Sequence, residues 1–177
     1  MSFKSFIHVG KNNPDLAPLF ADQNAFTSLI EQLAMLFRGI PIDKIAAIEG
    51  KGTVLGSAVA HTLQVGLIQV RPEGKLEGVV HSVTYVNYSK KEKILEIEKK
   101  AIQPGERILI IDDWAETGST LHAAIQLVEK AGGIVVGIGV FMDETSPEVR
   151  ASLARFNYRF LEQVGPHDIF RERTNRP

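Results

Sequence analysis

Two adjacent carboxylic acids, Asp112 and Asp113, stand a few residues before a run of hydroxyl groups and one glycine. Carboxylates accept hydrogen bonds from neighbouring hydroxyls and attract metal ions. The run that follows suits a phosphate group, because hydroxyls donate hydrogen bonds and a glycine lets the backbone approach an anion closely. Its members are Thr117, Gly118, Ser119 and Thr120. A ribose 5-phosphate has both a diol that needs acceptors and a phosphate that needs donors, so it fits this combination.

The elements around these residues are predicted to hold them at one edge of a sheet. Residues 107–111 are almost wholly apolar, which is typical of a strand buried in a parallel sheet. A helix is expected over residues 118–131, ended by Gly132 and Gly133. Ligands of open α/β sheets bind at the carboxyl ends of strands, and the first turn of a helix offers free amides to an anion. The acids and the hydroxyl run are therefore predicted to form one ligand site.

The rest of the chain alternates strands and helices, which predicts an α/β fold with a mostly parallel twisted sheet flanked by helices. A helix with Asp22 as its N-cap and a tight turn at residues 49–53 are the clearest local signals. The polar segment 71–93 is expected to be a long loop, either a mobile lid or a disordered segment, and the lid is expected at residues 85–93. The expected helices are 23–38, 54–63, 118–131 and 148–155, and the expected strands are 45–48, 66–70, 95–102, 107–111, 134–142 and 158–164.

The run from Ile110 to Thr120 resembles the signature with which type I phosphoribosyltransferases bind phosphoribosyl pyrophosphate (PRPP). The resemblance extends along most of the chain and is closest to adenine phosphoribosyltransferases. Residues 14–22, 47–58 and 71–78 resemble the N-terminal segment, the pyrophosphate loop and the Gly-Lys-Leu segment of that family. It implies one domain over 1–177, with hood elements at about 1–25 and 71–95 and a polar tail at 165–177.

The resemblance also implies roles for individual residues. Catalysis is expected to involve Asp112, Asp113 and Asn87, and the two acids are expected to meet Mg²⁺ indirectly, through PRPP and water. Lys51 and Gly52 are expected to hold pyrophosphate, with Arg71 and Lys75 assisting. The whole expected PRPP-binding set is Asp112, Asp113, Ala115, Glu116, Thr117, Gly118, Ser119, Thr120, Lys51, Gly52, Arg71 and Lys75.

The chain departs from the family at several of these places. Pro72 replaces a lysine, and Val86-Asn87-Tyr88 stands where the family has Leu-Glu-Tyr, whose glutamate is the family's catalytic acid. Trp114 and Glu116 replace an aliphatic residue and an alanine. An indole there can stack on a ligand ring or pack beneath the loop. The departures leave open a second reading, a regulatory protein that senses PRPP or a nucleotide with little catalysis, and a weaker third, transfer to a non-purine base.

Composition excludes several other classes of function. The 177 residues carry a net charge of -1, so no general attraction to nucleic acid or to an anionic membrane is expected. The absence of cysteine excludes disulfides and thiolate chemistry. No signal peptide is readable, so the cytoplasm is the default location. The expected partners are PRPP and a nucleobase, a purine first, and the resemblance implies a homodimer.

Overall fold

The computed structural model of this protein describes residues 3–9, 14–87 and 89–165. Its core is a seven-stranded sheet with the strand order β5-β6-β4-β3-β7-β8-β9. The strands from β4 to β9 in that order run parallel, whereas β6 pairs antiparallel with both β4 and β5. The strands are β3 (Lys44–Ile48), β4 (Gly66–Pro72), β5 (Val80–Val86), β6 (Glu92–Glu98), β7 (Arg107–Ala115), β8 (Ile134–Asp143) and β9 (Tyr158–Gln163).

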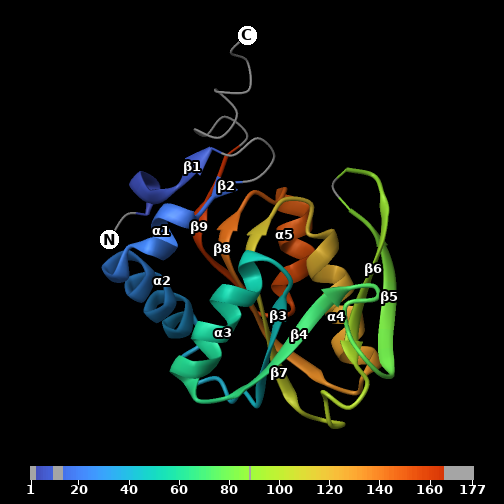
Figure 1. The fold of residues 1–177 in the computed structure, drawn as a ribbon. Coiled ribbons are helices and arrows are strands. Elements are labelled where there is room, and N and C mark those ends of the chain that lie inside the picture. The colour runs from blue at the N-terminus through green and yellow to red at the C-terminus, as the bar shows by residue number, and fades with distance from the viewer. Residues whose placement is uncertain (1–2, 10–13, 88, 166–177) are drawn as a thin grey trace.

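Helices cover both faces of this sheet (Figure 1). They are α1 (Ala17–Ala21), α2 (Gln23–Leu36), α3 (Lys51–Leu63), α4 (Ser119–Lys130) and α5 (Pro147–Ala154). The arrangement confirms the predicted fold class. Among the described residues, no helix is long and apolar enough to cross a membrane.

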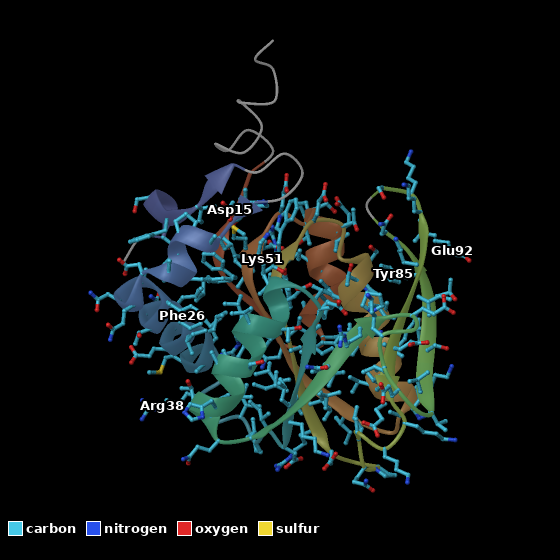
Figure 2. All side chains as sticks on the ribbon, viewed as in Figure 1. Asp15, Phe26, Arg38, Lys51, Tyr85 and Glu92 are labelled. Atoms are coloured by element: carbon cyan, nitrogen blue, oxygen red, sulfur yellow. The ribbon has the colours of Figure 1, made fainter. Side chains whose placement is uncertain are left out.

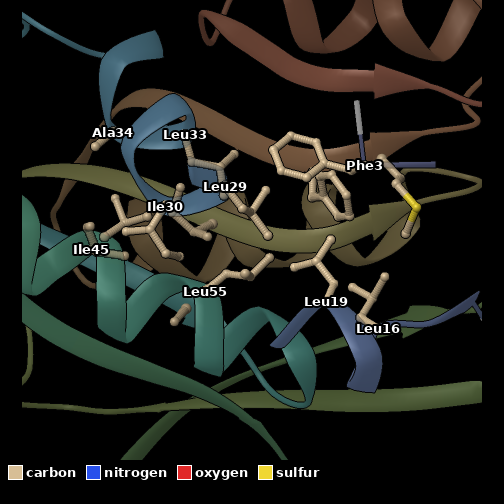
Figure 3. Close-up of a cluster of buried hydrophobic side chains, with 14 of the residues drawn as sticks. Phe3, Leu16, Leu19, Leu29, Ile30, Leu33, Ala34, Ile45 and Leu55 are labelled. Carbon is tan, nitrogen blue, oxygen red and sulfur yellow. The ribbon is translucent and has the colours of Figure 1, made fainter. Parts of the chain in front are cut away.

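Strand β7 lies inside the sheet and is buried on both faces. Leu109 and Ile111 belong to the apolar cluster beneath α2 and α3, part of which is drawn in Figure 3. Ile108 and Ile110 belong to the opposite cluster, beneath α4. Side chains alternate between the two faces of a strand, so an unbroken apolar run serves both clusters at once. This burial makes β7 a rigid support for the acids at its end.

Most of the expected elements are present with small shifts at their ends. Asp22 caps α2 as predicted, since its Oδ1 accepts a hydrogen bond of 2.8 Å from the amide of Ala25. Helix α3 begins at Lys51, so part of the expected turn 49–53 is already helical. Strand β7 continues to Ala115, and Asp112 and Asp113 therefore belong to the strand itself.

The expectation of a long loop over residues 71–93 is wrong. Strand β4 runs on to Pro72, and β5 pairs with β6 as an antiparallel hairpin. Val83 and Tyr85 are half buried against the cluster beneath α4, while Thr84 and Val86 face solvent. This alternation, together with β-branched and aromatic residues, is a strand signal that the neighbouring polar residues obscured. The strand expected at 95–102 is β6, which ends at Glu98.

The N-terminal part, which was predicted only by resemblance, forms a short 3-10 helix, Lys4–Phe6, and a small two-stranded sheet of β1 (His8–Val9) and β2 (Pro14–Asp15), followed by α1. Phe3, Leu16 and Leu19 are buried in the cluster beneath α2 and α3. Within the expected C-terminal tail, residues 166–177 lie outside the described part of the chain, as does Tyr88.

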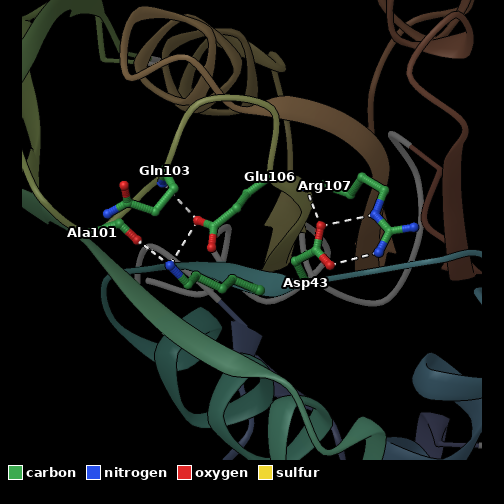
Figure 4. A network of polar contacts seen from close by, with 6 residues as sticks. Asp43, Ala101, Gln103, Glu106 and Arg107 are labelled. Atoms are coloured by element: carbon green, nitrogen blue, oxygen red, sulfur yellow. Dashed lines mark hydrogen bonds and ion pairs between the residues drawn. The ribbon is translucent and has the colours of Figure 1, made fainter.

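Two ion pairs join β3 to β7 at the amino ends of these strands (Figure 4). Arg107 binds Asp43 through two nitrogens, at 2.6 and 2.9 Å, and Lys44 binds Glu106 at 2.7 Å. Arg107 lowers the pKa of the Asp43 carboxyl well below its ordinary value. The pairs hold the register of the two strands whose opposite ends carry the candidate site.

Candidate active site at the carboxyl ends of two strands

Strands β3 and β7 are parallel neighbours, and each is followed by a helix that starts at the same edge of the sheet. A cavity of about 280 Å³ lies at this edge. Figure 2 labels Lys51, at the start of α3, and Tyr85, on the hairpin. The cavity is lined by Ile48, Glu49, Pro72, Tyr85, Leu95, Asp112, Asp113, Trp114, Ala115, Glu116, Thr117, Gly118, Ser119, Thr120 and Leu121. The structure thus brings together every expected site residue that lies between Asp112 and Thr120.

The two acids line this cavity, with Asp112 buried and Asp113 partly exposed. Asp112 is only 6% exposed, and its Oδ1 accepts a hydrogen bond of 2.9 Å from the amide of Asp113. Burial raises the pKa of both carboxyls, and for Asp112 the neighbouring charge of Asp113 raises it further. A ligand that donates hydrogen bonds to this pair, or a cation beside it, would favour the ionised form.

The start of α3 lies directly against the acids. A Cβ atom on Gly52 would stand 2.6 Å from Oδ1 of Asp112 and 3.2 Å from its Cα, so only glycine permits this approach. The amide of Gly52 and the charge of Lys51 lower the pKa of Asp113 and so oppose the effect of its burial. Lys51 Nζ also donates a hydrogen bond of 2.7 Å to the carbonyl of Pro14 in the N-terminal segment.

The residues before α4 form a loop with amides available for an anion. Gly118 is the N-cap of α4 and has a left-handed backbone, with φ of 70°. Thr117 Oγ1 lies 2.9 Å from Ser119 Oγ and accepts a long bond of 3.4 Å from the Ser119 amide. Among the described residues, the amides of Thr117, Gly118 and Thr120 have no protein acceptor. The predicted phosphate-binding loop therefore keeps its donors free.

Five expected site residues do not line the cavity: Lys51 and Gly52, which lie at the start of α3, and Arg71, Lys75 and Asn87. Arg71 is paired with Glu49 at 2.9 Å, and it is Glu49 that reaches the cavity wall. Lys75 lies exposed after β4. Asn87 ends β5, and its Oδ1 accepts hydrogen bonds from Ser89 N, Ser89 Oγ and Lys91 N at 3.1, 2.9 and 3.0 Å. This geometry gives Asn87 a structural role in the hairpin, and its catalytic role stays a prediction.

Besides Trp114, six lining residues were not expected as ligand contacts: Ile48, Glu49, Pro72, Tyr85, Leu95 and Leu121. Tyr85 begins the predicted lid, and Pro72 falls in the expected long loop. The strand alternation of residues 80–86 is the signal that could have placed Tyr85. Trp114 lines the cavity and also packs against the cluster beneath α2 and α3. The indole therefore packs beneath the loop, and its place on the cavity wall also leaves stacking on a ligand ring as a prediction.

A second cavity, of about 610 Å³, shares Glu116 and Thr117 with the first. Its wall includes Thr145, Ser146 and Pro147 at the start of α5 and Gln163 and Val164 after β9. The Glu116 carboxylate, which lies between the two cavities, makes no hydrogen bond or ion pair with any residue that the structure describes.

A buried network supports this second wall. Asp143 is fully buried and accepts hydrogen bonds from Thr145 Oγ1 at 2.6 Å and from the Tyr158 hydroxyl at 2.7 Å. Arg150 completes the network with an ion pair to Asp143 at 2.6 Å. Because Asp143 is satisfied on all sides, it is a structural acid.

The carboxylate oxygens of the two aspartates could bind a cation whose other ligands come from a bound phosphate compound and water. Within the described part of the chain, no group of three or more histidine, aspartate or glutamate residues could hold a metal ion. Mg²⁺ commonly binds through one or two carboxylates together with phosphate oxygens and water. The pair can supply that share, directly or through water.

Comparison with known proteins agrees with this geometry. Residues 19–163 match the family described as "Phosphoribosyl transferase domain". The chain is 42% identical over 139 residues to an adenine phosphoribosyltransferase of Cereibacter sphaeroides, covering 78% of this chain and 77% of that one. A relative of the same name from Dinoroseobacter shibae is 43% identical over 139 residues, covering 78% and 76% of the two chains.

Solved structures agree as well. The adenine phosphoribosyltransferase of Rhodothermus marinus matches with a TM-score of 0.84 and 31% identity, over 92% of this chain and 96% of that chain. The enzyme of Giardia lamblia, solved with 9-deazaadenine, matches with a TM-score of 0.83 and 26% identity, over 91% and 95%. The resemblance found in the sequence is thereby confirmed.

Proposed function

Because the chain belongs to the phosphoribosyl transferase domain family, we propose that it is an enzyme that transfers ribose 5-phosphate from PRPP to adenine and releases pyrophosphate. The observation that carries this proposal is the cavity in which free loop amides and two adjacent carboxylates lie together. Adenine is proposed as the acceptor because the similar proteins are named adenine phosphoribosyltransferases.

PRPP is proposed to lie across the ends of β7 and β3. The loop of Thr117, Gly118, Ser119 and Thr120 would hold the 5-phosphate, and Asp112 and Asp113 would accept hydrogen bonds from the ribose diol. The pyrophosphate would then face the start of α3, where backbone amides and the positive helix end favour an anion. Lys51 adds a cation there once its bond to Pro14 is exchanged or shared.

The reaction exchanges one bond at the anomeric carbon for another. The bond from this carbon to a pyrophosphate oxygen breaks with its electron pair on the oxygen, and a ring nitrogen of the base forms the new bond and loses its proton. The protein mainly has to align the two partners and stabilise charge on the leaving group. Mg²⁺, which we propose as the cofactor, would neutralise part of the pyrophosphate charge. The residues that would hold it, through PRPP and water, are Asp112 and Asp113.

The proton of the base needs an acceptor, and we propose Glu116 for this role beside its contact with PRPP. The base is proposed to occupy the second cavity, because that cavity adjoins the loop that holds the sugar phosphate. Glu116 lines both cavities, and its carboxylate has no partner among the described residues, so it is available to a ligand. A carboxylate can take a proton, whereas the amide of Asn87 cannot.

The remaining proposals concern the setting of the enzyme. The hairpin of β5 and β6, with Tyr85 on the cavity wall, is proposed to close over PRPP and exclude water. We further propose a cytoplasmic homodimer organised as a single domain, with Arg71 and Lys75 reaching the pyrophosphate on closure. Sedimentation equilibrium of the purified protein measures the oligomeric state directly.

A panel assay tests the function. Purified protein with PRPP and Mg²⁺ is offered adenine, hypoxanthine, guanine, xanthine, uracil and orotate, and pyrophosphate release is measured. Turnover with adenine is expected, and Asp113→Asn serves as the matched inactive control. Turnover with a different base alone would correct the acceptor, whereas tight PRPP binding without turnover on any base would replace the enzyme by the regulatory protein.

A further inference from the structure

His122, in the first turn of α4, joins the proposed phosphate loop to α5. Its Nδ1 lies 2.8 Å from the carbonyl oxygen of Gly118, which also accepts a bond of 3.0 Å from the His122 amide. Its other ring nitrogen, Nε2, lies 3.2 Å from Ser152 Oγ on α5. The imidazole therefore connects the loop to α5. No ligand contact is proposed for Ser152.

The chemistry of the partners fixes one hydrogen position on this ring. A carbonyl oxygen only accepts hydrogen bonds, so Nδ1 must carry a proton to bind Gly118. Nε2 is then an acceptor, and the single hydrogen of Ser152 Oγ is shared between the carbonyl of Val149, at 2.7 Å, and Nε2, at 3.2 Å. The contact to Gly118 is thus a directed N–H to carbonyl bond, and the contact to Ser152 steadies the ring from behind.

Holding the Gly118 carbonyl also orients the Ser119 amide, because the two groups belong to one planar trans peptide and point in opposite directions. With the oxygen turned toward His122, the Ser119 N–H is turned away from α4 and toward the loop's anion side. The only described protein acceptor for this N–H is Thr117 Oγ1, at 3.4 Å, which is a weak bond that a phosphate can replace.

This peptide needs such a restraint because glycine precedes it. Gly118 has φ of 70°, a conformation that costs glycine little but that glycine also leaves easily. Packing restrains only its position: a Cβ atom there would stand 2.6 Å from Cγ1 of Val149, so α5 directly backs the loop. The Gly118 carbonyl accepts one bond from the His122 amide and a second from Nδ1, and the imidazole bond adds to the restraint that opposes rotation of the peptide.

We propose that His122 is a positioning residue for the 5-phosphate, which acts by fixing the Gly118–Ser119 peptide so that the Ser119 amide faces the ligand. This inference rests on the proposed function and deepens it. His122 contacts the loop at Gly118 and is not among the residues that line the proposed PRPP cavity. It should therefore govern affinity for the phosphate end of the ligand and leave the chemical step unchanged.

Three variants separate the two contacts of the ring. His122→Ala removes both, whereas the Nδ2 of Asn is attached to Cγ as Nδ1 of histidine is, so His122→Asn keeps the donor to Gly118 and loses Ser152. Ser152→Ala removes only the rear contact. In His122→Ala, we expect the Kd and KM for PRPP to rise about three- to tenfold and kcat to stay unchanged. A change of this size corresponds to the free energy of about one hydrogen bond. His122→Asn should recover most of the PRPP affinity lost in His122→Ala. Ser152→Ala should lower PRPP affinity less than His122→Ala does.

Isothermal titration with PRPP and Mg²⁺, and separately with pyrophosphate and Mg²⁺, provides the decisive comparison. Pyrophosphate lacks the 5-phosphate, so His122→Ala should bind it as wild type does. The amide resonance of Ser119 in the unliganded protein should shift in His122→Ala and much less in His122→Asn, which tests the peptide orientation without any ligand.

Equal PRPP binding by wild type and His122→Ala would overturn the inference and leave the proposed function standing. So would a His122→Asn variant as weak as His122→Ala, or an equal loss of pyrophosphate binding, since either would indicate general damage to α4. Wild-type protein that does not bind PRPP would instead overturn the proposed function, and this inference with it.

Discussion

Asp112 loses most of its hydration when the chain folds and Asp113 loses part of it, and their like charges lie on consecutive residues of one strand. Burial raises the pKa of both, so the ionised pair is less stable in the folded protein than in the unfolded chain. The pair is retained, on the proposed function, because a ribose diol supplies the hydrogen bonds that water no longer can. Binding and stability are therefore opposed at these residues.

Asp113→Asn separates the two effects. The substitution keeps the shape of the side chain and removes one charge, so we expect PRPP affinity or turnover to fall by about a hundredfold, which is the loss of two strong hydrogen bonds to a charged group. The melting temperature of the unliganded protein should stay equal or rise. Trp114 is the only tryptophan and lines the cavity, so its fluorescence can follow PRPP binding. Unchanged PRPP affinity would contradict the site assignment.

Glu116→Gln tests the proton acceptor. The amide keeps the size of the side chain but cannot take a proton, so kcat should fall about a hundredfold while KM for PRPP stays within about twofold. Glu116→Asp keeps the carboxylate and is the matched control. A variant with normal kcat would assign the proton to another group or to water.

In the hairpin of β5 and β6, Asn87 has a predicted catalytic role and an observed structural one. Asn87→Ala removes the acceptor of three hydrogen bonds inside the hairpin. If that is its main role, amide hydrogen exchange at residues 89–91 should quicken while kcat with saturating PRPP falls less than about threefold. A loss of about a hundredfold in kcat with unchanged exchange would instead restore the predicted catalytic role of Asn87.

Strand β7 and helix α4 were predicted from the sequence, whereas the hairpin of β5 and β6 was not. Strand β7 and helix α4 were predictable because an apolar run, two acids and a glycine fall within fifteen consecutive positions, so local physics decides their form. The hairpin was missed because Asn87, Lys90 and Lys91 make the segment look like a solvated loop, and its strand form depends on packing against α4. The contact of His122 with Ser152 joins residues thirty positions apart, and no local pattern announces it.

For the whole molecule, the two ends of the sheet respond to pH with opposite sign. At the amino ends of β3 and β7, Arg107 lowers the pKa of Asp43 below its ordinary value of 3.8, so this pair stabilises the fold above that pH and its contribution is lost as the pH falls. At the carboxyl ends, the raised pKa of Asp112 means that the folded protein holds a proton that the unfolded chain has released. That contribution is present at low pH and is lost as the pH rises through the raised value.

Melting temperatures measured from about pH 3 to about pH 8 should therefore form a dome whose two sides are set by different ends of the same strand. Asp43→Asn should lower the melting temperature near neutral pH and flatten the acidic side, because the group that must be protonated there is gone. Asp112→Asn should raise the melting temperature near neutral pH and flatten the other side. Saturating PRPP and Mg²⁺ should raise the melting temperature of the wild type but much less that of Asp112→Asn, since binding stabilises only the folded state. If both substitutions changed the melting temperature near neutral pH in the same direction, the proposal would be refuted. The two ends of the sheet would then not have opposite effects on stability.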